Sequence, residues 1–204
     1  MQNKYLFRTL MWGSLAVVIL AGLTIFTIEK ANSSRAAIPV ISRLPEFSFT
    51  ERSGKPFGLA DLKGKLTVAD FIFTDCPGAC PVMSEKMSEL YKLYTSDAER
   101  GDKVQFVSIT VDPETDSLEV LQEYAKRYNA GNQWFFLRGE LAEVIKLSEQ
   151  GFKIPAADLP SGHSTKFILI DEDAQVRGYY SPNTKEGLAL LKTHLRELAL
   201  EEKK

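Results

Sequence analysis

Apolar residues follow two different periods along this chain, and together they predict alternating strands and helices. Nearly continuous β-prone runs at 67–73 and 104–111 are typical of strands that are buried on both faces of a sheet. After Pro81, apolar residues recur at three- and four-residue spacing as far as Tyr94, which predicts an amphipathic helix. Other patterns predict a hairpin from 44 that turns near 54, a helical turn at 59–64, helices at 118–128, 140–150 and 184–200, and strands at 134–137, 165–171 and 176–180.

The order of these elements indicates the fold class. Strands alternate with helices, and the last two strands form an antiparallel pair before the final helix, which is typical of an α/β layer architecture with a mixed sheet. About 160 residues are the size of one domain with a substantial core. The sequence therefore predicts a thioredoxin-like, three-layer fold over residues 44–204 with a central mixed β-sheet.

The amino-terminal part of the chain has a different composition. Residues 10–28 contain no charged side chain, and at about 1.5 Å per residue a helix of that length spans roughly 28 Å, close to the hydrocarbon thickness of a bilayer. Lys4 and Arg8 precede this run, and Trp12 lies near its start. We therefore expect a single-pass transmembrane helix at 10–28, with residues 1–9 in the cytoplasm.

A cleaved secretory signal is the alternative for this segment, with a cut near Ala31 or Ala37. Its apolar region is usually only about 7–15 residues long, so the length favours an uncleaved anchor. Both interpretations place the main domain on the non-cytoplasmic side. Residues 29–43 are predicted to be the linker between the membrane and that domain.

Charge excludes one class of partner. Without residues 1–28, 23 basic and 27 acidic residues remain, a net charge of −4. No basic patch of the kind that binds nucleic acid is visible in the sequence. We expect no nucleic-acid partner and a monomeric soluble domain.

The two cysteines of the chain, Cys76 and Cys80, lie between the strand at 67–73 and the following helix. They could form a structural disulfide, act as a redox couple or bind a metal. One pair is not a disulfide scaffold in a domain that has its own core, which favours a chemical role. At i and i+4 near a helix start the two sulfurs face the same way, with room for an ion between them, and the free N–H groups lower thiol pKa.

A third ligand would have to come from elsewhere in the sequence. His194 lies within the final helix beside Lys192 and Arg196, and an ordinary helix position explains it. His163 lies directly before a predicted core strand, so it should be at a sheet edge as the cysteines are. Taken alone, His163 would still be interpreted as an ordinary loop histidine whose hydrogen bonds are made within the protein.

Three stretches together resemble the Sco/SenC family: Phe-x-Phe-Thr-x-Cys-Pro-x-x-Cys-Pro from Phe71, Val-Ser-Ile-Thr-Val-Asp-Pro from Val107, and His-Ser-x-x-x-Ile-Leu-Ile-Asp from His163. The resemblance runs from about residue 44 to residue 198. It implies a membrane-anchored, thioredoxin-like copper protein that assists cytochrome c oxidase assembly. It also implies that Cys76, Cys80 and His163 bind copper, as Cu(I) or Cu(II), for the copper-site subunit of the oxidase.

Ligand chemistry agrees with this resemblance. Thiolates select Cu(I), and imidazole suits either oxidation state of copper, whereas zinc would also accept these ligands. Cu(II) would need a fourth donor, for which Asp75 or a water is a candidate. The chain departs from the family pattern at Pro77-Gly78-Ala79, where an acidic residue is common, and at Gly162, where aspartate is common.

Other polar and sulfur-containing residues have alternative roles. Met83 and Met87 could be soft ligands, but their helical spacing favours core packing. Asp112 lies in the loop after the second core strand and is a candidate neighbour of the metal site. Asp70 interrupts an apolar strand and needs a partner if it is buried.

The sequence favours two functions from different classes, and a third function agrees with it less well. The first is copper delivery to, or preparation of, an oxidase copper site. The second is a thiol–disulfide oxidoreductase in which Cys76 and Cys80 are catalytic and reduce a cuproprotein partner. A peroxiredoxin-like role would need a threonine three residues before the cysteine, and Thr74 is only two before Cys76.

Overall fold

The computed structural model describes residues 12–13, 17, 19–22, 24, 38–96 and 102–201. The chain divides into two compact units, Met1–Ala37 and Ile38–Lys204. Most of the expected anchor at 10–28 lies outside the described residues. Within the described part of the chain, no helix has both the length and the apolar character needed to cross a bilayer.

An eight-stranded mixed sheet forms the centre of the second unit, with the strand order β1-β8-β7-β4-β5-β6-β2-β3. The three middle strands β4, β5 and β6 are parallel, and all other pairs are antiparallel. The strands are β1 (Ser42–Arg43), β2 (Ser48–Glu51), β3 (Pro56–Gly58), β4 (Leu66–Ile72), β5 (Val104–Thr110), β6 (Trp134–Arg138), β7 (Phe167–Ile170) and β8 (Gln175–Tyr180).

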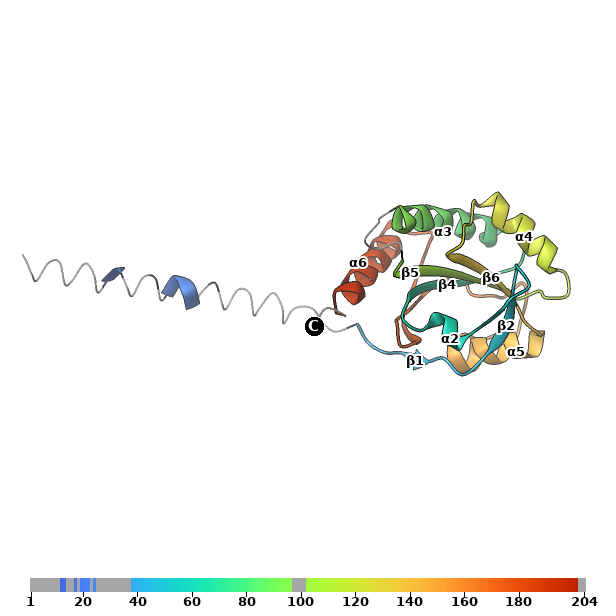
Figure 1. Ribbon diagram of the computed structural model, residues 1–204, viewed down its shortest axis with the longest axis horizontal. Coiled ribbons are helices and arrows are strands. Elements are labelled where there is room, and N and C mark those ends of the chain that lie inside the picture. Colours follow the sequence, from blue (N-terminus) through green and yellow to red (C-terminus); the bar gives the residue numbers. More distant parts are fainter. Residues whose placement is uncertain are drawn as a thin grey trace, which may run out of the picture. The chain divides into compact units, whose positions relative to one another are not determined.

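Helices cover both faces of this sheet, which gives the expected three layers. Figure 1 shows α3, α4 and α6 on one face and α2 and α5 on the other. Their bounds are α2 (Leu59–Leu62), α3 (Ala79–Thr95), α4 (Leu118–Arg127), α5 (Leu141–Lys146) and α6 (Lys185–Glu201), and a π-helical turn, η1 (Leu147–Gly151), continues α5. The α/β fold with a central mixed sheet is thus confirmed.

Side chains of β4 alternate between the two layers of the core. Val68 and Ile72 pack in the cluster beneath α3, α4 and α6, whereas Ala69 and Phe71 pack in the cluster beneath α2 and α5. All seven residues of β4 are buried, as a central parallel strand requires. By the same alternation Asp70 lies on the α3 side.

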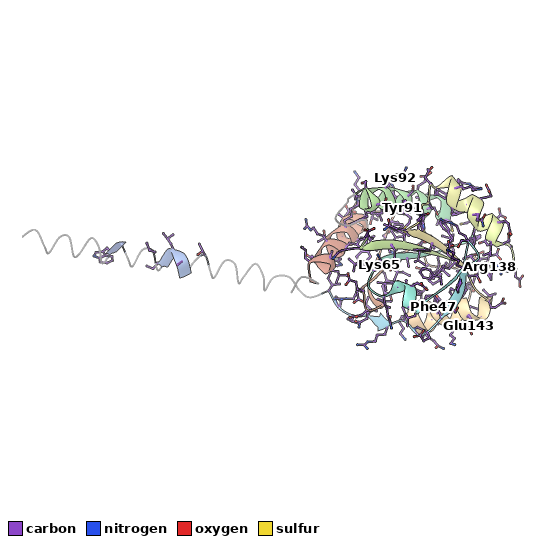
Figure 2. The ribbon with its side chains drawn as sticks, viewed as in Figure 1. Phe47, Lys65, Tyr91, Lys92, Arg138 and Glu143 are labelled. Atoms are coloured by element: carbon purple, nitrogen blue, oxygen red, sulfur yellow. The ribbon has the colours of Figure 1, made fainter. Side chains whose placement is uncertain are left out.

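Aromatic rings fill much of the space between α3 and the sheet. Tyr91 of α3, labelled in Figure 2, lies with its ring centroid 5.6 Å from that of Phe106 and 5.8 Å from that of Trp134. Trp134 in turn stacks on Phe136 at 5.2 Å. Burying each large apolar side chain of this kind contributes about 1.5–3 kcal/mol, so these contacts fix α3 firmly over the sheet.

The strands expected at 67–73 and 104–111, and the hairpin near Gly54, are confirmed to within a few residues. Helix α3 begins two residues earlier than expected, at Ala79, with Gly78 as its N-cap. Pro81 still fits, because N–H groups in the first turn have no intrahelical acceptor. The earlier start places Cys80 inside the helix and leaves Cys76 before it.

Strand β1 was not expected from the sequence. It lies within 29–43, the segment expected to be a linker, and pairs with β8. Ile38, just before it, is 5% exposed and packs in the core. The described domain therefore includes residues that composition alone assigned to the linker.

Candidate metal centre

Cys76 and Cys80 lie where β4 leads into α3. The Cys76 N–H donates a hydrogen bond to the Phe73 carbonyl oxygen at 3.3 Å, which turns the chain directly after the strand. Cys80 is the second residue of α3 and is fully buried, whereas Cys76 is partly exposed. Both cysteines are free thiols. The pair thus has one sulfur that faces outward and one that faces the core.

Strand pairing brings His163 to the same place. β7 runs antiparallel to β4, with Ala69 opposite Ile168, so the segment that leads into β7 meets the end of β4. His163 Nε2 lies 3.2 Å from Cys80 Sγ. One ligand atom from each of Cys76, Cys80 and His163 lies within 4.8 Å of the other two. The two sulfurs and the ring nitrogen can therefore converge on a single ion.

The hydrogen bonds of His163 define its tautomer. Nδ1 lies 3.0 Å from the Ser164 carbonyl oxygen, which can only accept, so Nδ1 carries the proton and donates. Nε2 is then the unprotonated nitrogen that faces Cys80, and a neutral ring of this kind is the usual metal-binding form of histidine. The Phe73 ring lies edge-on to the imidazole at 5.4 Å and covers it.

Burial acts on the pKa of the histidine as well. It lowers the pKa of His163 below its ordinary value, and hydrogen bonds to the backbone of Ser164 and Phe71 oppose this only in part. The ring is consequently neutral around pH 7, with Nε2 available to a ligand.

The two thiols have opposite pKa shifts. Burial raises the pKa of Cys80 to about 12, despite a favourable hydrogen bond from the Phe73 backbone. At Cys76 burial also acts to raise the pKa, but backbone N–H groups of Cys80 and Gly78 outweigh it, and the pKa of Cys76 is lowered. Free N–H groups at a helix start stabilise a thiolate in this way. Cys76 is therefore the more reactive sulfur.

Several other candidates from the sequence lie outside this group. Asp75 is exposed, and the only group of metal-ligand side chains in the described part of the chain is the set of three named above. Met83 and Met87 are fully buried in the core cluster that also contains Cys80, as their spacing predicted. His194 is on α6, where its Nδ1 lies 2.6 Å from the hydroxyl of Tyr180 on β8, and it belongs to the packing of that helix against the sheet.

A carboxylate that was not expected from the sequence lies close to the cysteine loop. Asp116 is fully buried and bonds to Thr74, two residues before Cys76. Asp112, the residue expected near the site, lies in the same loop, and its N–H donates to the Thr110 hydroxyl at 3.0 Å. A signal was available, since loops that follow adjacent parallel strands meet at one edge of the sheet.

A pocket of about 390 Å³ adjoins the cysteine loop, between that loop and α4. Its lining residues are Thr74, Asp75, Glu119, Val120, Glu123, Tyr124 and Arg127. A larger pocket of about 450 Å³ near Arg52 and Gln105 contains neither cysteine nor histidine. The chemistry of the three convergent ligands, rather than pocket size, therefore identifies the candidate site.

Known proteins resemble this chain in both sequence and fold. A SCO1 protein homolog from Bacillus subtilis is 31% identical over 167 residues, which cover 79% of this chain and 85% of that protein. The solved structure of BsSco, a Sco family cytochrome c oxidase assembly protein with a disulfide switch, is 28% identical. It has a TM-score of 0.69 and covers 79% of this chain and 96% of that one.

Copper-bound yeast Sco1 is a second structural relative, with 26% identity and a TM-score of 0.61. The match covers 76% of this chain and 89% of that one. Residues 39–196 match the SCO1/SenC family. This range includes both cysteines, His163 and every strand of the sheet. The chain belongs to the SCO1/SenC family.

Proposed function

We propose that this protein binds copper through Cys76, Cys80 and His163 and delivers it to, or prepares, the copper site of cytochrome c oxidase. One observation carries the proposal: the three ligand atoms lie within 4.8 Å of one another although His163 is far from the cysteines in sequence. Copper is the cargo of this function, not a fixed part of the fold.

The donor set suits copper. Two thiolates select Cu(I) over harder ions, and a neutral imidazole binds either oxidation state. The unprotonated Nε2 of His163 faces the sulfurs, while its Nδ1–H bond to Ser164 keeps the ring in that orientation. Yeast Sco1, a relative at 26% identity, has been solved with copper bound, which supports the same cargo here.

Copper binding can be tested on the full chain purified anaerobically in detergent. Reconstitution with Cu(I) or Cu(II) should yield one copper per chain, and Cu(II) should show sulfur-to-copper charge-transfer absorption. His163→Ala should weaken Cu(II) binding, whereas the matched variant His194→Ala should bind as wild type does, because His194 belongs to α6. Unchanged Cu(II) binding by His163→Ala would show that the three-ligand proposal is wrong. A competition titration with Zn²⁺, the other metal that accepts these ligands, measures how strongly the site prefers copper.

The proposed location follows from the amino-terminal sequence. Nineteen residues without charge at 10–28, preceded by Lys4 and Arg8, support a single membrane span with a cytoplasmic amino terminus. The domain would then lie outside the cytoplasm, beside a membrane-bound oxidase subunit. Protease added to intact spheroplasts should digest the domain, and protection from protease would contradict this topology.

A thiol–disulfide oxidoreductase is the second candidate function, and the unequal thiols favour it. The partly exposed Cys76 thiolate would attack a partner disulfide, forming a mixed disulfide and releasing one partner thiolate. Cys80 would then attack the Cys76 sulfur and release the second partner thiolate. Two electrons thereby pass from the Cys76–Cys80 dithiol to the partner, and a Cys76–Cys80 disulfide is left.

The two functions differ in their need for the histidine. Thiol exchange with an oxidised peptide from a copper-site subunit should survive His163→Ala and be abolished by Cys76→Ser or Cys80→Ser. Copper binding should depend on all three residues. A protein that reduces the peptide at the same rate with and without His163, yet needs His163 for copper, would have both activities.

A further inference from the structure

A single buried carboxylate fastens the loop that carries Cys76 to the neighbouring strand. Asp116 is fully buried, in the loop between β5 and α4. Both of its oxygens lie 3.2 Å from the Thr74 N–H, and the Thr74 hydroxyl also donates to it. The Thr110 hydroxyl, at the end of β5, donates to the second oxygen. Two threonines thus hold both oxygens of this carboxylate.

The topology explains why this contact forms at the candidate site. β4 and β5 are parallel and in register, with Ile72 opposite Thr110, so the loops after both strands leave the sheet at one edge. The Val111 N–H donates to the Ile72 carbonyl oxygen at 2.8 Å and continues the pairing one step further. The Asp116 N–H donates to the Asp112 carbonyl oxygen at 2.9 Å, which holds the carboxylate in place.

Of the three ligands, Cys76 is the one whose loop segment Asp116 holds most directly. Thr74 lies two residues before Cys76, and the turn between them is closed by the bond from the Cys76 N–H to Phe73. Cys80 is held separately by α3, and His163 by its bond to Ser164. The position of the Cys76 sulfur relative to the other two ligand atoms therefore depends on the bonds between Thr74 and Asp116.

We propose that Asp116 is a positioning residue that holds Cys76 in the arrangement of the open dithiol. A disulfide requires the sulfurs to approach to about 2.05 Å, with a specific dihedral angle. Bonds that hold the Cys76 loop in the dithiol arrangement oppose this approach, so Asp116 favours the reduced form and the preformed three-ligand site. The part of this inference that concerns copper rests on the proposed function, whereas the part that concerns the disulfide does not.

The disulfide equilibrium is the direct test. In a glutathione buffer the protein dithiol and one oxidised glutathione exchange with the protein disulfide and two reduced glutathiones, and the ratio at equilibrium gives a constant, Kox. Asp116→Asn keeps the shape of the side chain but replaces one acceptor oxygen with an NH₂ group. We expect Kox to rise about tenfold, the effect of losing one hydrogen bond to a charged group in one redox state only.

Thr74 provides a milder pair of variants. Thr74→Val removes only the hydroxyl that donates to Asp116 and should raise Kox in the same direction. Thr74→Ser keeps that hydroxyl and should leave Kox within about twofold of wild type. Thr74→Val also decides the question if Asp116→Asn does not fold, because an unchanged Kox in Thr74→Val would overturn the proposal.

A second buried aspartate serves as the matched control for stability. Asp171 accepts bonds from the N–H groups of Asp173 and Gln175 and from Arg177 Nη1, at the turn between β7 and β8. Asp171→Asn should lower the melting temperature without a change in Kox. If Asp116→Asn also lowers the melting temperature and leaves Kox unchanged, Asp116 only stabilises the fold and the proposal is wrong.

Spectroscopy of the copper-loaded full chain is the second readout. Asp116→Asn and Thr74→Val should shift the thiolate-to-Cu(II) absorption, whereas Thr74→Ser and Asp171→Asn should not. If wild type itself shows no such absorption, the proposed copper function fails, but the changes in Kox still test the role of Asp116. Altered Kox values with wild-type copper spectra would restrict Asp116 to the disulfide equilibrium and overturn its role at the metal site.

Discussion

Cys80 Sγ and His163 Nε2 lie 3.2 Å apart, although 83 residues separate them in the sequence. The antiparallel pairing of β7 with β4 produces this proximity, because the start of one strand then lies beside the end of the other. Both residues are held in place, because Cys80 is part of α3 and the Ser164 carbonyl oxygen orients the His163 ring. Sheet pairing thus assembles the ligand pair.

The two thiols should react at very different rates with an alkylating reagent. The pKa of Cys76 is lowered by helix-start N–H groups, whereas burial raises that of Cys80 to about 12. At pH 8 iodoacetamide should modify Cys76 at least about tenfold faster, because the thiolate is the reacting form. Peptide mapping by mass spectrometry after timed quenching measures both rates. Cys80→Ser should keep the fast rate, and equal rates in the wild-type protein would contradict the assignment.

Asp70 should make the fold less stable as the pH rises. Its side chain is buried, Ser108 donates to one oxygen at 2.7 Å, and the other has no hydrogen-bond partner in the described part of the chain. Burial raises the pKa of Asp70 from its ordinary 3.8 to about 7. Between these values the folded state keeps a proton that the unfolded state has lost, so the free energy of unfolding falls as pH increases.

Asp70→Asn removes this titration and should abolish that part of the pH dependence. The full effect above pH 7 is of the order of 4 kcal/mol, since each unit of pKa difference corresponds to about 1.4 kcal/mol. Urea denaturation at pH 5 and pH 8 should show roughly 2.6 kcal/mol of this loss, because at pH 5 the unfolded state has already released its proton. Ser108→Ala keeps the carboxyl group and should retain the loss of stability with rising pH. An Asp70→Asn protein with the wild-type pH profile would show that another group is responsible.

Gly162 should be required for the position of His163. A Cβ atom at Gly162 would lie 2.7 Å from Asp158 Cβ and 3.0 Å from the Asp158 carbonyl oxygen, so the loop would have to shift. Gly162→Ala should weaken Cu(II) binding about tenfold by moving the neighbouring imidazole, a cost of about 1.4 kcal/mol, and should leave Kox unchanged. Titration with Cu(II) in the presence of a competing chelator measures the affinity.

Gly78→Ala is the matched control for this substitution. Gly78 also lies beside the site, but a Cβ atom there would meet nothing within 4 Å. This variant should bind Cu(II) with wild-type affinity. Equal losses in both variants would mean that any added methyl group near the site disturbs it.

Met83 should contribute packing and not ligation. It is fully buried among the apolar residues beneath α3. Met83→Leu conserves volume and should change the free energy of unfolding by less than about 1.5 kcal/mol, with copper stoichiometry and absorption unchanged. Thermal denaturation and metal analysis of the same preparation give both values. A lost or altered copper spectrum in a folded variant would identify the thioether as a ligand.

Much of the fold follows from local patterns that can be read from the chain. The all-apolar runs predicted the central strands because a parallel strand is buried on both faces. The period of three and four residues predicted α3, and capping residues predicted α4. The pairing of β1 with β8 was missed because two residues carry no recognisable period. The start of α3 was misplaced by two residues because proline is acceptable anywhere in a first turn.

The sequence by itself determined which residues have metal-binding chemistry: two cysteines four positions apart at a helix start, and a histidine before a strand. Only the tertiary structure decided that the three ligand atoms converge within 4.8 Å, and that Asp116 rather than Asp112 holds the cysteine loop. It also decided which sulfur is buried, and therefore which thiol has the higher pKa. The physical reason is that side-chain chemistry is local, whereas distance, burial and hydrogen-bond partners depend on which strands lie side by side.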